Sequence, residues 1–237
     1  MKKINILGIP FVDTTKKEFV SHVLTLATSN KEPISIVTAN PEIVMLTKEN
    51  AQYEQYVQRS TYVVADGIGV VIGSKILGTP LRERIPGYEL VHAFMKNADV
   101  NKNRFFFYGG KPGIAEAAAK KAIALYPHIN IVGTADGYGD RDAVATQAAS
   151  LKPDFIFIAT GAPKQEEWIA SHRHQFEHCV MMGVGGSLDV LSGNVRRAPQ
   201  LFIKLNLEWF YRLITQPTRI KRMMKIPLFL LKVLQSK

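Results

Sequence analysis

The strongest constraint on the fold is a series of short, almost continuously apolar runs, each separated from the next by a stretch with helical periodicity. In the clearest run, Phe155–Ile158, four consecutive residues are hydrophobic. Such a run is typical of a strand that is buried on both faces, as in a parallel sheet. We predict strands at Ile4–Leu7, Ile34–Thr38, Tyr62–Ala65, Arg104–Tyr108, Asn130–Gly133, Asp154–Ala159 and Val180–Gly183.

Helical patterns occupy the stretches between these runs, at Lys16–Thr28, Glu42–Asn50, Tyr88–Asn97, Ile114–Leu125, Asp142–Ser150 and Gln165–Gln175. Alternating strands and helices predict a parallel sheet, because consecutive parallel strands need a crossover and a helix supplies it. We therefore predict an α/β fold: a Rossmann-like, mainly parallel sheet with helices on both faces. The length of 237 residues suits one such body, alone or with an appendage.

Charge is distributed unevenly along the chain, whose formal net charge is +10 at pH 7. From Arg196 to Lys237 there are ten lysines and arginines and a single acid, Glu208, whereas the preceding residues carry 20 basic and 19 acidic groups. The body is therefore nearly neutral and the tail is strongly basic. Such asymmetry indicates an anionic partner for the tail: a membrane surface, phosphate groups or nucleic acid.

The tail also carries large apolar side chains between its basic groups. In Gln200–Gln216 we expect one amphipathic helix with Leu201, Leu205, Trp209 and Leu213 on a single stripe. Basic groups interleaved with such side chains suit a helix that lies on an anionic membrane. The alternative is a terminal helix docked on the body with its charges solvated. No recognisable nucleic-acid-reading module is present, so we predict no nucleic-acid partner.

These observations divide the chain into an α/β body, residues 1–196, and a basic, amphipathic, membrane-associating C-terminal appendage, residues 197–237. No segment approaches the ~20 apolar residues of a membrane-spanning helix. The single cysteine, Cys179, leaves no partner for an intrachain disulfide, which fits a reducing compartment. We predict a cytoplasmic protein, peripheral on the inner face of the cell membrane. An apolar tail can equally be covered by another subunit, so a homo-oligomer stays open.

Glycine-rich turns follow several of the predicted strands, at residues 108–113, 133–137 and 183–187. Ligands of open α/β sheets bind at the carboxyl ends of the strands, where glycine lets backbone N–H groups approach a phosphate. Gly109, Gly110, Asp136 and Gly137 are therefore candidate nucleotide contacts, although glycine after a strand is usually just a tight turn. Neither the dinucleotide fingerprint nor a P-loop occurs.

Four motifs occur in a fixed order over residues 35 to 200. They are Thr38–Glu42 (TANPE), Ala65–Gly69 (ADGIG) with Arg82, Arg84, Pro86 and Gly87 following, Gly161–Glu166 (GAPKQE), and Gly183–Asp189 (GVGGSLD) leading to Gly193 and Arg197–Pro199. The ordered set resembles the WecG/TagA/CpsF glycosyltransferase family. The basic tail is similar to the C-terminal appendage of the teichoic-acid branch of that family, which docks at the membrane and helps to close the active site.

The resemblance implies an inverting, metal-independent sugar transfer, with no cofactor. The donor would be UDP-N-acetylmannosamine, and the acceptor N-acetylglucosamine linked to undecaprenyl diphosphate, whose 4-hydroxyl attacks the anomeric carbon. The product would be the linkage-unit disaccharide of wall teichoic acid. Members of the family use other sugars, including N-acetylmannosaminuronic acid, and no residue separates them.

Asp66 is the leading candidate for a catalytic residue. It follows the apolar run Tyr62–Ala65, so we expect it at a strand end. Inverting transfer needs a carboxylate to take the proton of the acceptor hydroxyl. The alternative is a turn aspartate that caps the helix starting near Ile68. The family motif around Asp66 favours the base.

Four further residues are assigned to the substrate pocket by the resemblance. Thr38 and Asn40 follow a strand, and Asn40 also suits an N-cap before Pro41. Gln165 stands at a predicted helix start, where capping is the alternative role. Asp189 either contacts the nucleotide or supports the glycine-rich loop before it.

Arginines are the expected partners of the departing UDP, because a guanidinium binds phosphate bidentately and stays charged. Arg84, within a motif, is the catalytic candidate in the body, and Arg212, Arg219 and Arg222 are candidates in the tail. The tail arginines would contact either the acceptor diphosphate or lipid head groups, and all four arginines also suit a solvated surface. No convincing metal pattern occurs; we expect His172 and His174 to be exposed helix residues.

Two other classes of function compete with a transferase. A non-catalytic UDP-sugar-binding scaffold, recruited to the membrane by its tail, would explain the glycine-rich loops without a role for Asp66. A nicotinamide-dependent oxidoreductase would use a similar sheet, but the missing G-x-G-x-x-G argues against it.

Overall fold

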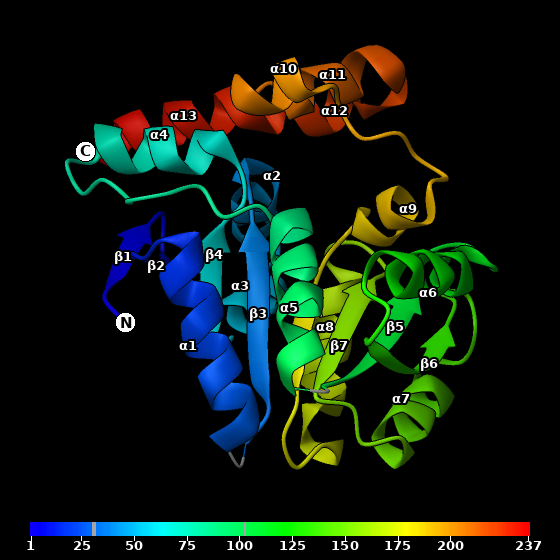
Figure 1. Cartoon of the computed structure of the whole chain (residues 1–237). Helices are drawn as coiled ribbons and strands as arrows, with labels where there is room; N and C mark the ends of the chain where they lie inside the picture. Colours follow the sequence, from blue (N-terminus) through cyan, green and yellow to red (C-terminus); the bar gives the residue numbers. More distant parts are fainter. Residues whose placement is uncertain (30–31, 102) are drawn as a thin grey trace.

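The computed structural model describes residues 1–29, 32–101 and 103–237, apart from the side chains of residues 28, 99–101, 219 and 221. An eight-stranded sheet forms its centre, in the order β1-β2-β4-β3-β8-β7-β5-β6 (Figure 1). The strands are β1 (Lys3–Ile6), β2 (Ile9–Val12), β3 (Ile34–Ala39), β4 (Tyr62–Ala65), β5 (Arg104–Gly109), β6 (Asn130–Ala135), β7 (Phe155–Ala159) and β8 (Val180–Gly183). Every neighbouring pair is parallel except β1 with β2, which confirms the mainly parallel α/β prediction.

The antiparallel edge of the sheet was not predicted. β1 and β2 form a hairpin whose turn residues, Leu7 and Gly8, have φ angles of 50° and 85°. Two consecutive residues in the left-handed region suit a tight turn between antiparallel strands. The predicted strand extended into this turn, at Leu7, and β2 was missed. Pro10, which has no N–H for the ladder, makes β2 resemble a loop in the sequence.

Helices cover both faces of the sheet. On the face that carries Phe105, Phe107, Phe155 and Phe157 lie α1 (Lys16–Ser29), α5 (Gly87–Asn101), α6 (Ile114–Leu125) and α9 (Ser187–Ser192). On the opposite face lie α2 (Pro41–Glu49), α3 (Ala51–Gln58), α4 (Ile68–Ile76), α7 (Arg141–Ser150) and α8 (Lys164–His172), which a short 3₁₀ turn, η1 (Arg173–Gln175), follows. The phenylalanine-rich strands are thus buried on both sides, as their sequences predicted.

The two central strands send the chain to opposite faces of the sheet. β3 and β8 are parallel neighbours, yet β3 leads into α2 on one face and β8 leads into α9 on the other. Such a switch point leaves the carboxyl ends of the two strands between diverging helices, which is where open α/β sheets bind ligands. The residues that follow β3, β4 and β8 are therefore the first place to look for a site.

The tail crosses the carboxyl-end edge of the sheet as a series of short helices (Figure 1). These are α10 (Gln200–Lys204), α11 (Glu208–Thr215), η2 (Pro217–Arg219), α12 (Ile220–Met223) and α13 (Lys225–Gln235). The single helix expected over Gln200–Gln216 is wrong. Asn206 adopts a φ of 59° between α10 and α11, and a left-handed residue cannot continue a right-handed helix.

The last helix of the tail belongs to a core cluster of the body. Phe229 and Val233 of α13 are fully buried against α2 and α4. The ring of Phe229 lies so close to Gly73 that a Cβ at that glycine would stand 2.9 Å from the ring. Two ion pairs, Arg222–Glu42 and Lys225–Glu49, join the same region to α2. α13 is therefore packed as a core helix on one side.

Candidate active site

Asp66 lies at the junction of β4, β3 and α5. It immediately follows β4, and its N–H donates to the carbonyl of Ala39 at the end of β3, at 2.9 Å. Its Oδ1 accepts a hydrogen bond from the N–H of Gly87, the first residue of α5, also at 2.9 Å. The predicted position at a strand end is confirmed. The carboxylate is bound at the amino-terminal end of a long helix, which favours negative charge.

Charged groups from the body and the tail act on Asp66. Burial raises the pKa of Asp66 above its ordinary value, whereas the Gly87 N–H and the charges of Arg84 and Arg212 lower it. The charge of Glu208, at the start of α11, adds to the increase. A carboxyl group with a raised pKa accepts a proton more readily, which suits a general base.

Thr38 and Asn40 stand beside Asp66, and both have structural partners. The hydroxyl of Thr38 donates to the carbonyl of Gly183 at 3.0 Å, which connects the end of β3 with the end of β8. The side chain of Asn40 accepts from the N–H of Ile43 at 3.0 Å, so its capping role is present. A Cβ on Gly87 would stand 3.0 Å from the Thr38 hydroxyl, so glycine allows α5 to start this close to β3.

Gln165 is buried beneath the glycine-rich loop after β8 instead of pointing outward. It is 2% exposed; its Oε1 accepts from the N–H of Gly185 at 3.0 Å, and its Nε2 donates to Glu166 at 2.7 Å. The capping alternative is wrong, because Pro163 occupies the N-cap position of α8. In this state Gln165 fixes the glycine-rich loop that follows β8.

The candidate nucleotide contacts gather at the ends of β5, β6 and β7. Gly110 donates its N–H to Ala159, and Gly137 donates to the carbonyl of Gly110 at 2.9 Å, so the three turns meet. Gly109 packs so tightly that a Cβ there would stand 2.5 Å from the backbone of Ala159. Asp136 accepts from the N–H of Tyr138 and shapes its own turn.

Asp189 lies in the first turn of α9. Its Oδ1 accepts from the side chain of Asn194 at 3.4 Å, and its carbonyl accepts from Val195. These bonds stabilise the chain that leads from α9 toward the tail.

The arginines do not all converge on one point. Arg84 donates from Nη2 to Oε2 of Glu208 at 3.3 Å, and Arg212 on α11 acts electrostatically on Asp66. Arg222 instead pairs with Glu42 in the first turn of α2, at 2.6 Å. The side chain of Arg219 lies outside the described residues. Body and tail thus contribute one arginine each to the surroundings of Asp66, and the tail also contributes Glu208.

Sequence reasoning missed Glu208 and gave Arg197 no role. Arg197 lies 3.8 Å from Glu208 and 3.6 Å from Glu89 of α5, and its guanidinium stands 4.5 Å from the ring centre of Tyr88. The available signal was that Glu208 is the only acid among the last 42 residues. An acid in so basic a segment indicates a specific partner.

No group of three potential metal ligands is found among the described residues. The expectation of two exposed histidines is wrong for His172, which is 6% exposed. Its two ring nitrogens contact Asp142 and the carbonyl of Trp168, each at 2.8 Å, so it joins α7 to α8. Over the described part of the chain, no helix is long and apolar enough to span a bilayer.

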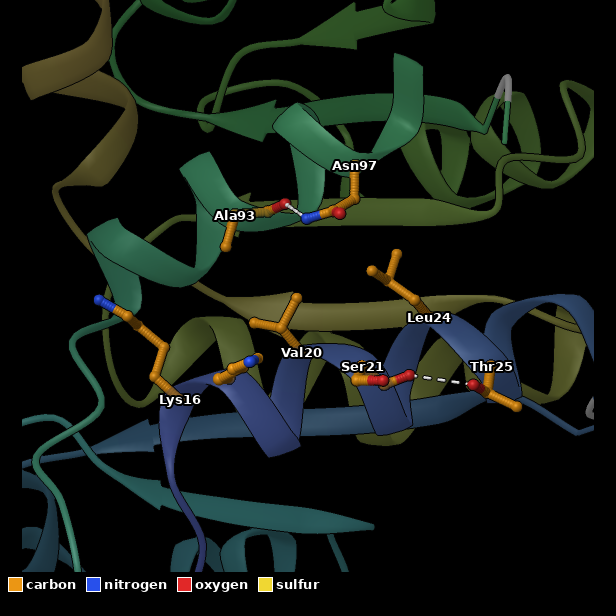
Figure 2. A pocket seen from close by; sticks show the side chains of 8 residues that line it. Lys16, Val20, Ser21, Leu24, Thr25, Ala93 and Asn97 are labelled. Carbon is orange, nitrogen blue, oxygen red and sulfur yellow. Dashed lines mark hydrogen bonds between the residues drawn. The ribbon is translucent and has the colours of Figure 1, made fainter. Parts of the chain in front are cut away.

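A groove of about 650 Å³ lies between α1 and α5, and Figure 2 shows its lining. The lining residues are Lys16, Lys17, Val20, Ser21, Leu24, Thr25, Ala93 and Asn97. None of them is a candidate site residue. The carboxyl end of β4, where charged groups act on Asp66, is therefore the better candidate for chemistry.

An α/β sheet with a carboxylate and arginines at its switch point is an arrangement suited to a group-transfer enzyme acting on phosphate-linked substrates. The chain belongs to the family described as "Glycosyl transferase WecG/TagA/CpsF family", whose profile matches residues 4–237. It is 43% identical over 235 residues to the N-acetylglucosaminyldiphosphoundecaprenol N-acetyl-beta-D-mannosaminyltransferase of Bacillus spizizenii, covering 99% of this chain and 91% of that one. It is 42% identical over 238 residues to the protein of the same name from Staphylococcus aureus, covering 99% and 93%.

Proposed function

We propose that this protein moves N-acetylmannosamine from UDP-N-acetylmannosamine to the 4-hydroxyl of N-acetylglucosamine on undecaprenyl diphosphate, which makes the linkage-unit disaccharide of wall teichoic acid. One observation carries the proposal. Asp66 stands at the carboxyl end of β4 in the field of Arg84 and Arg212, in a chain 42–43% identical to transferases named for this reaction.

The transfer is an inverting displacement. The acceptor hydroxyl oxygen attacks the anomeric carbon of the donor, and the bond from that carbon to the UDP oxygen breaks with its electron pair leaving on UDP. The hydroxyl proton goes to Asp66, whose raised pKa suits it to accept a proton as the new bond forms. The hydrogen bond from the Gly87 N–H holds the Asp66 carboxylate in position for this proton transfer.

The arginines act on the leaving group. UDP gains negative charge as the bond breaks, and fixed positive groups that stabilise this charge lower the barrier. Arg84 and Arg212, whose charges act on Asp66, are the groups to which we assign this role. We propose that they take the place of a metal ion and that the reaction needs none.

The outer side of the tail is the proposed membrane contact. Nine large apolar side chains of the tail are exposed: Leu201, Leu205, Phe210, Ile214, Ile220, Met224, Leu228, Leu231 and Leu234. In α13 the buried Phe229 and Val233 face the body while three of these leucines point away from it. A helix that is apolar on both sides needs a second apolar neighbour, and basic residues between the exposed groups favour an anionic bilayer.

A transfer assay tests this proposal. Purified protein is mixed with UDP-N-acetylmannosamine and a short-chain lipid-diphosphate-N-acetylglucosamine, and UDP release and disaccharide are followed with and without EDTA. We expect disaccharide in both conditions. Turnover that is lost in EDTA and restored by magnesium or manganese would refute metal independence.

The alternatives are outcomes of the same assay. A product formed only with another donor, such as UDP-N-acetylmannosaminuronic acid, would assign a different sugar to the same chemistry. Folded protein that binds UDP but turns over none of a panel of UDP-sugars would be a membrane-recruited scaffold instead of an enzyme.

A further inference from the structure

Glu208 is an unusual residue for its position. It is the only acid among the last 42 residues, and it stands at the first position of α11. Its side chain is 18% exposed, although a lone carboxylate in so basic a segment could remain in water at no cost. Burying a charge is unfavourable unless the charge is paired, so its position indicates that specific partners hold it there.

Each carboxylate oxygen of Glu208 faces an arginine that lies outside α11. Oε2 accepts from Arg84 at 3.3 Å, and Oε1 lies 3.8 Å from Nε of Arg197. The Arg84 and Arg197 side chains are 15% and 29% exposed, so water screens these pairs less than it screens surface pairs. One carboxylate therefore connects the start of α11 to the segment around Arg84 in the body and to the segment around Arg197, which joins α9 to α10.

The pair with Arg84 also fixes how that arginine is presented. A guanidinium has five N–H donors in one plane, so a bond from Nη2 to a carboxylate leaves the remaining donors for another anion. Among the described residues, Arg84 donates no other hydrogen bond. The remaining donors of Arg84 are therefore available to a diphosphate beside Asp66.

Arg197 anchors the other side of the carboxylate. It pairs with Glu89 at 3.6 Å and lies over the ring of Tyr88, both at the start of α5, whose first N–H binds Asp66. The Nε of Arg197 is buried and donates no hydrogen bond in this state. A small movement of Glu208 toward Arg197 would give this N–H a partner.

We propose that Glu208 is a positioning residue of the transfer reaction: it holds Arg84 toward the diphosphate of the substrate and seats α11, with Arg212, over Asp66. The proposal rests on the transferase function proposed above. It predicts that Glu208 sets both the placement of the arginines and the charge felt by the base.

Substitution at Glu208 separates positioning from simple structural support. The charge of Glu208 raises the pKa of Asp66, whereas Arg84 and Arg212 lower it. In a plot of kcat against pH, Glu208→Gln should therefore shift the rise on the acid side, the acid limb, to lower pH. Glu208→Asp keeps the charge and should leave the acid limb in place. Three other titratable groups lie near Arg197: Glu89, Tyr88 and His92. Burial and Arg197 lower the pKa of His92, and the charge of Glu89 raises it.

The experiment compares the kcat profiles of wild type, Glu208→Gln, Glu208→Asp and Glu49→Gln in the full-length protein. Glu49→Gln is the matched control, because it removes another tail-to-body pair, with Lys225, on an exposed part of α2. We expect kcat to fall on the order of tenfold to a hundredfold in Glu208→Gln, as for one lost charge-assisted hydrogen bond. Glu208→Asp should restore most of that loss, and Glu49→Gln should match wild type.

Two results would overturn the proposal. One is a Glu208→Gln enzyme with wild-type kcat and an unmoved acid limb. The other is an equal loss of kcat in the glutamine and aspartate variants with the acid limb unmoved, which would make Glu208 a structural contact only.

Hydrogen exchange over residues 208–215 gives a readout without substrate. Wild-type protein that makes no disaccharide would refute the proposed function, and exchange that is no faster in Glu208→Gln than in Glu49→Gln would separately refute the seating of α11.

Discussion

Replacing Phe229 with alanine tests how the tail is held on the body. The ring is fully buried against α2 and α4 and lies against Gly73. Deleting a buried phenylalanine ring costs about 3–5 kcal/mol, and the higher helix propensity of alanine offsets about 0.5 kcal/mol. The Lys225–Glu49 pair contributes at most about 1 kcal/mol, because such partly exposed pairs are weak. We therefore expect Phe229→Ala to weaken the docking of α13 by about 2.5–4.5 kcal/mol.

Hydrogen exchange is the most direct assay, because α13 can detach without unfolding of the sheet. Each 1.4 kcal/mol lost from the docking free energy raises the detached fraction tenfold. Amides of residues 225–235 should therefore exchange about a hundredfold faster or more in Phe229→Ala than in wild type. Leu231→Ala is the control, since Leu231 lies on the same helix but is 51% exposed, and it should change stability by less than about 0.5 kcal/mol. Equal exchange in wild type and Phe229→Ala would refute the packing argument.

Three further predictions concern the base, a buried acid and the outer face of the tail. Asp66→Asn should lower kcat by about 10²–10⁴-fold or more while UDP binding by calorimetry is unchanged; near-normal turnover would reject Asp66 as the base. Burial raises the pKa of Glu166 to about 7 from an unfolded value of 4.5, so its stabilising contribution is complete below 4.5 and is lost as pH rises through 7. Relative to Glu166→Gln, wild type should lose on the order of 3 kcal/mol of unfolding free energy over that range in urea titrations, and parallel pH profiles would contradict this. Serine at Leu228, Leu231 and Leu234 should abolish cosedimentation with anionic vesicles and cost less than about 1.5 kcal/mol of stability, because all three are exposed; unchanged sedimentation would count against the membrane face.

The interior strands could be predicted from the sequence because a strand buried on both faces is a run of consecutive apolar residues. Phe155–Ile158 is the clearest case, and its strand begins and ends where expected, apart from Asp154. Elements whose structure depends on single backbone conformations could not be predicted. The hairpin at Leu7 and the break at Asn206 both depend on a residue with positive φ. Leucine rarely adopts this conformation, and asparagine adopts it only occasionally, so neither residue predicts it at a given position.

The candidate site likewise contains features that could be predicted from the sequence and features that could not. Asp66 was located because a strand end is a local feature and a motif surrounds it. Gln165 was placed in the pocket, yet it is buried under the loop after β8, since its direction is set by Gly185, 20 residues later. The pairing of Arg84 with Glu208 spans 124 residues, and no local pattern predicts a contact of that range.

In the proposed mechanism, Asp66 belongs to the body and Arg212 to the tail, so that donor binding and tail docking form a single equilibrium. Only molecules with α11 in place present the complete set of charges, so the apparent dissociation constant for the donor is the intrinsic one divided by the docked fraction. A protein docked one time in ten would bind its donor about ten times more weakly than one that is always docked. Any surface that prefers the docked tail raises that fraction, and the bound donor strengthens attachment to that surface by the same factor. Affinity for the sugar nucleotide thereby becomes a measure of how much of the protein has its tail in place.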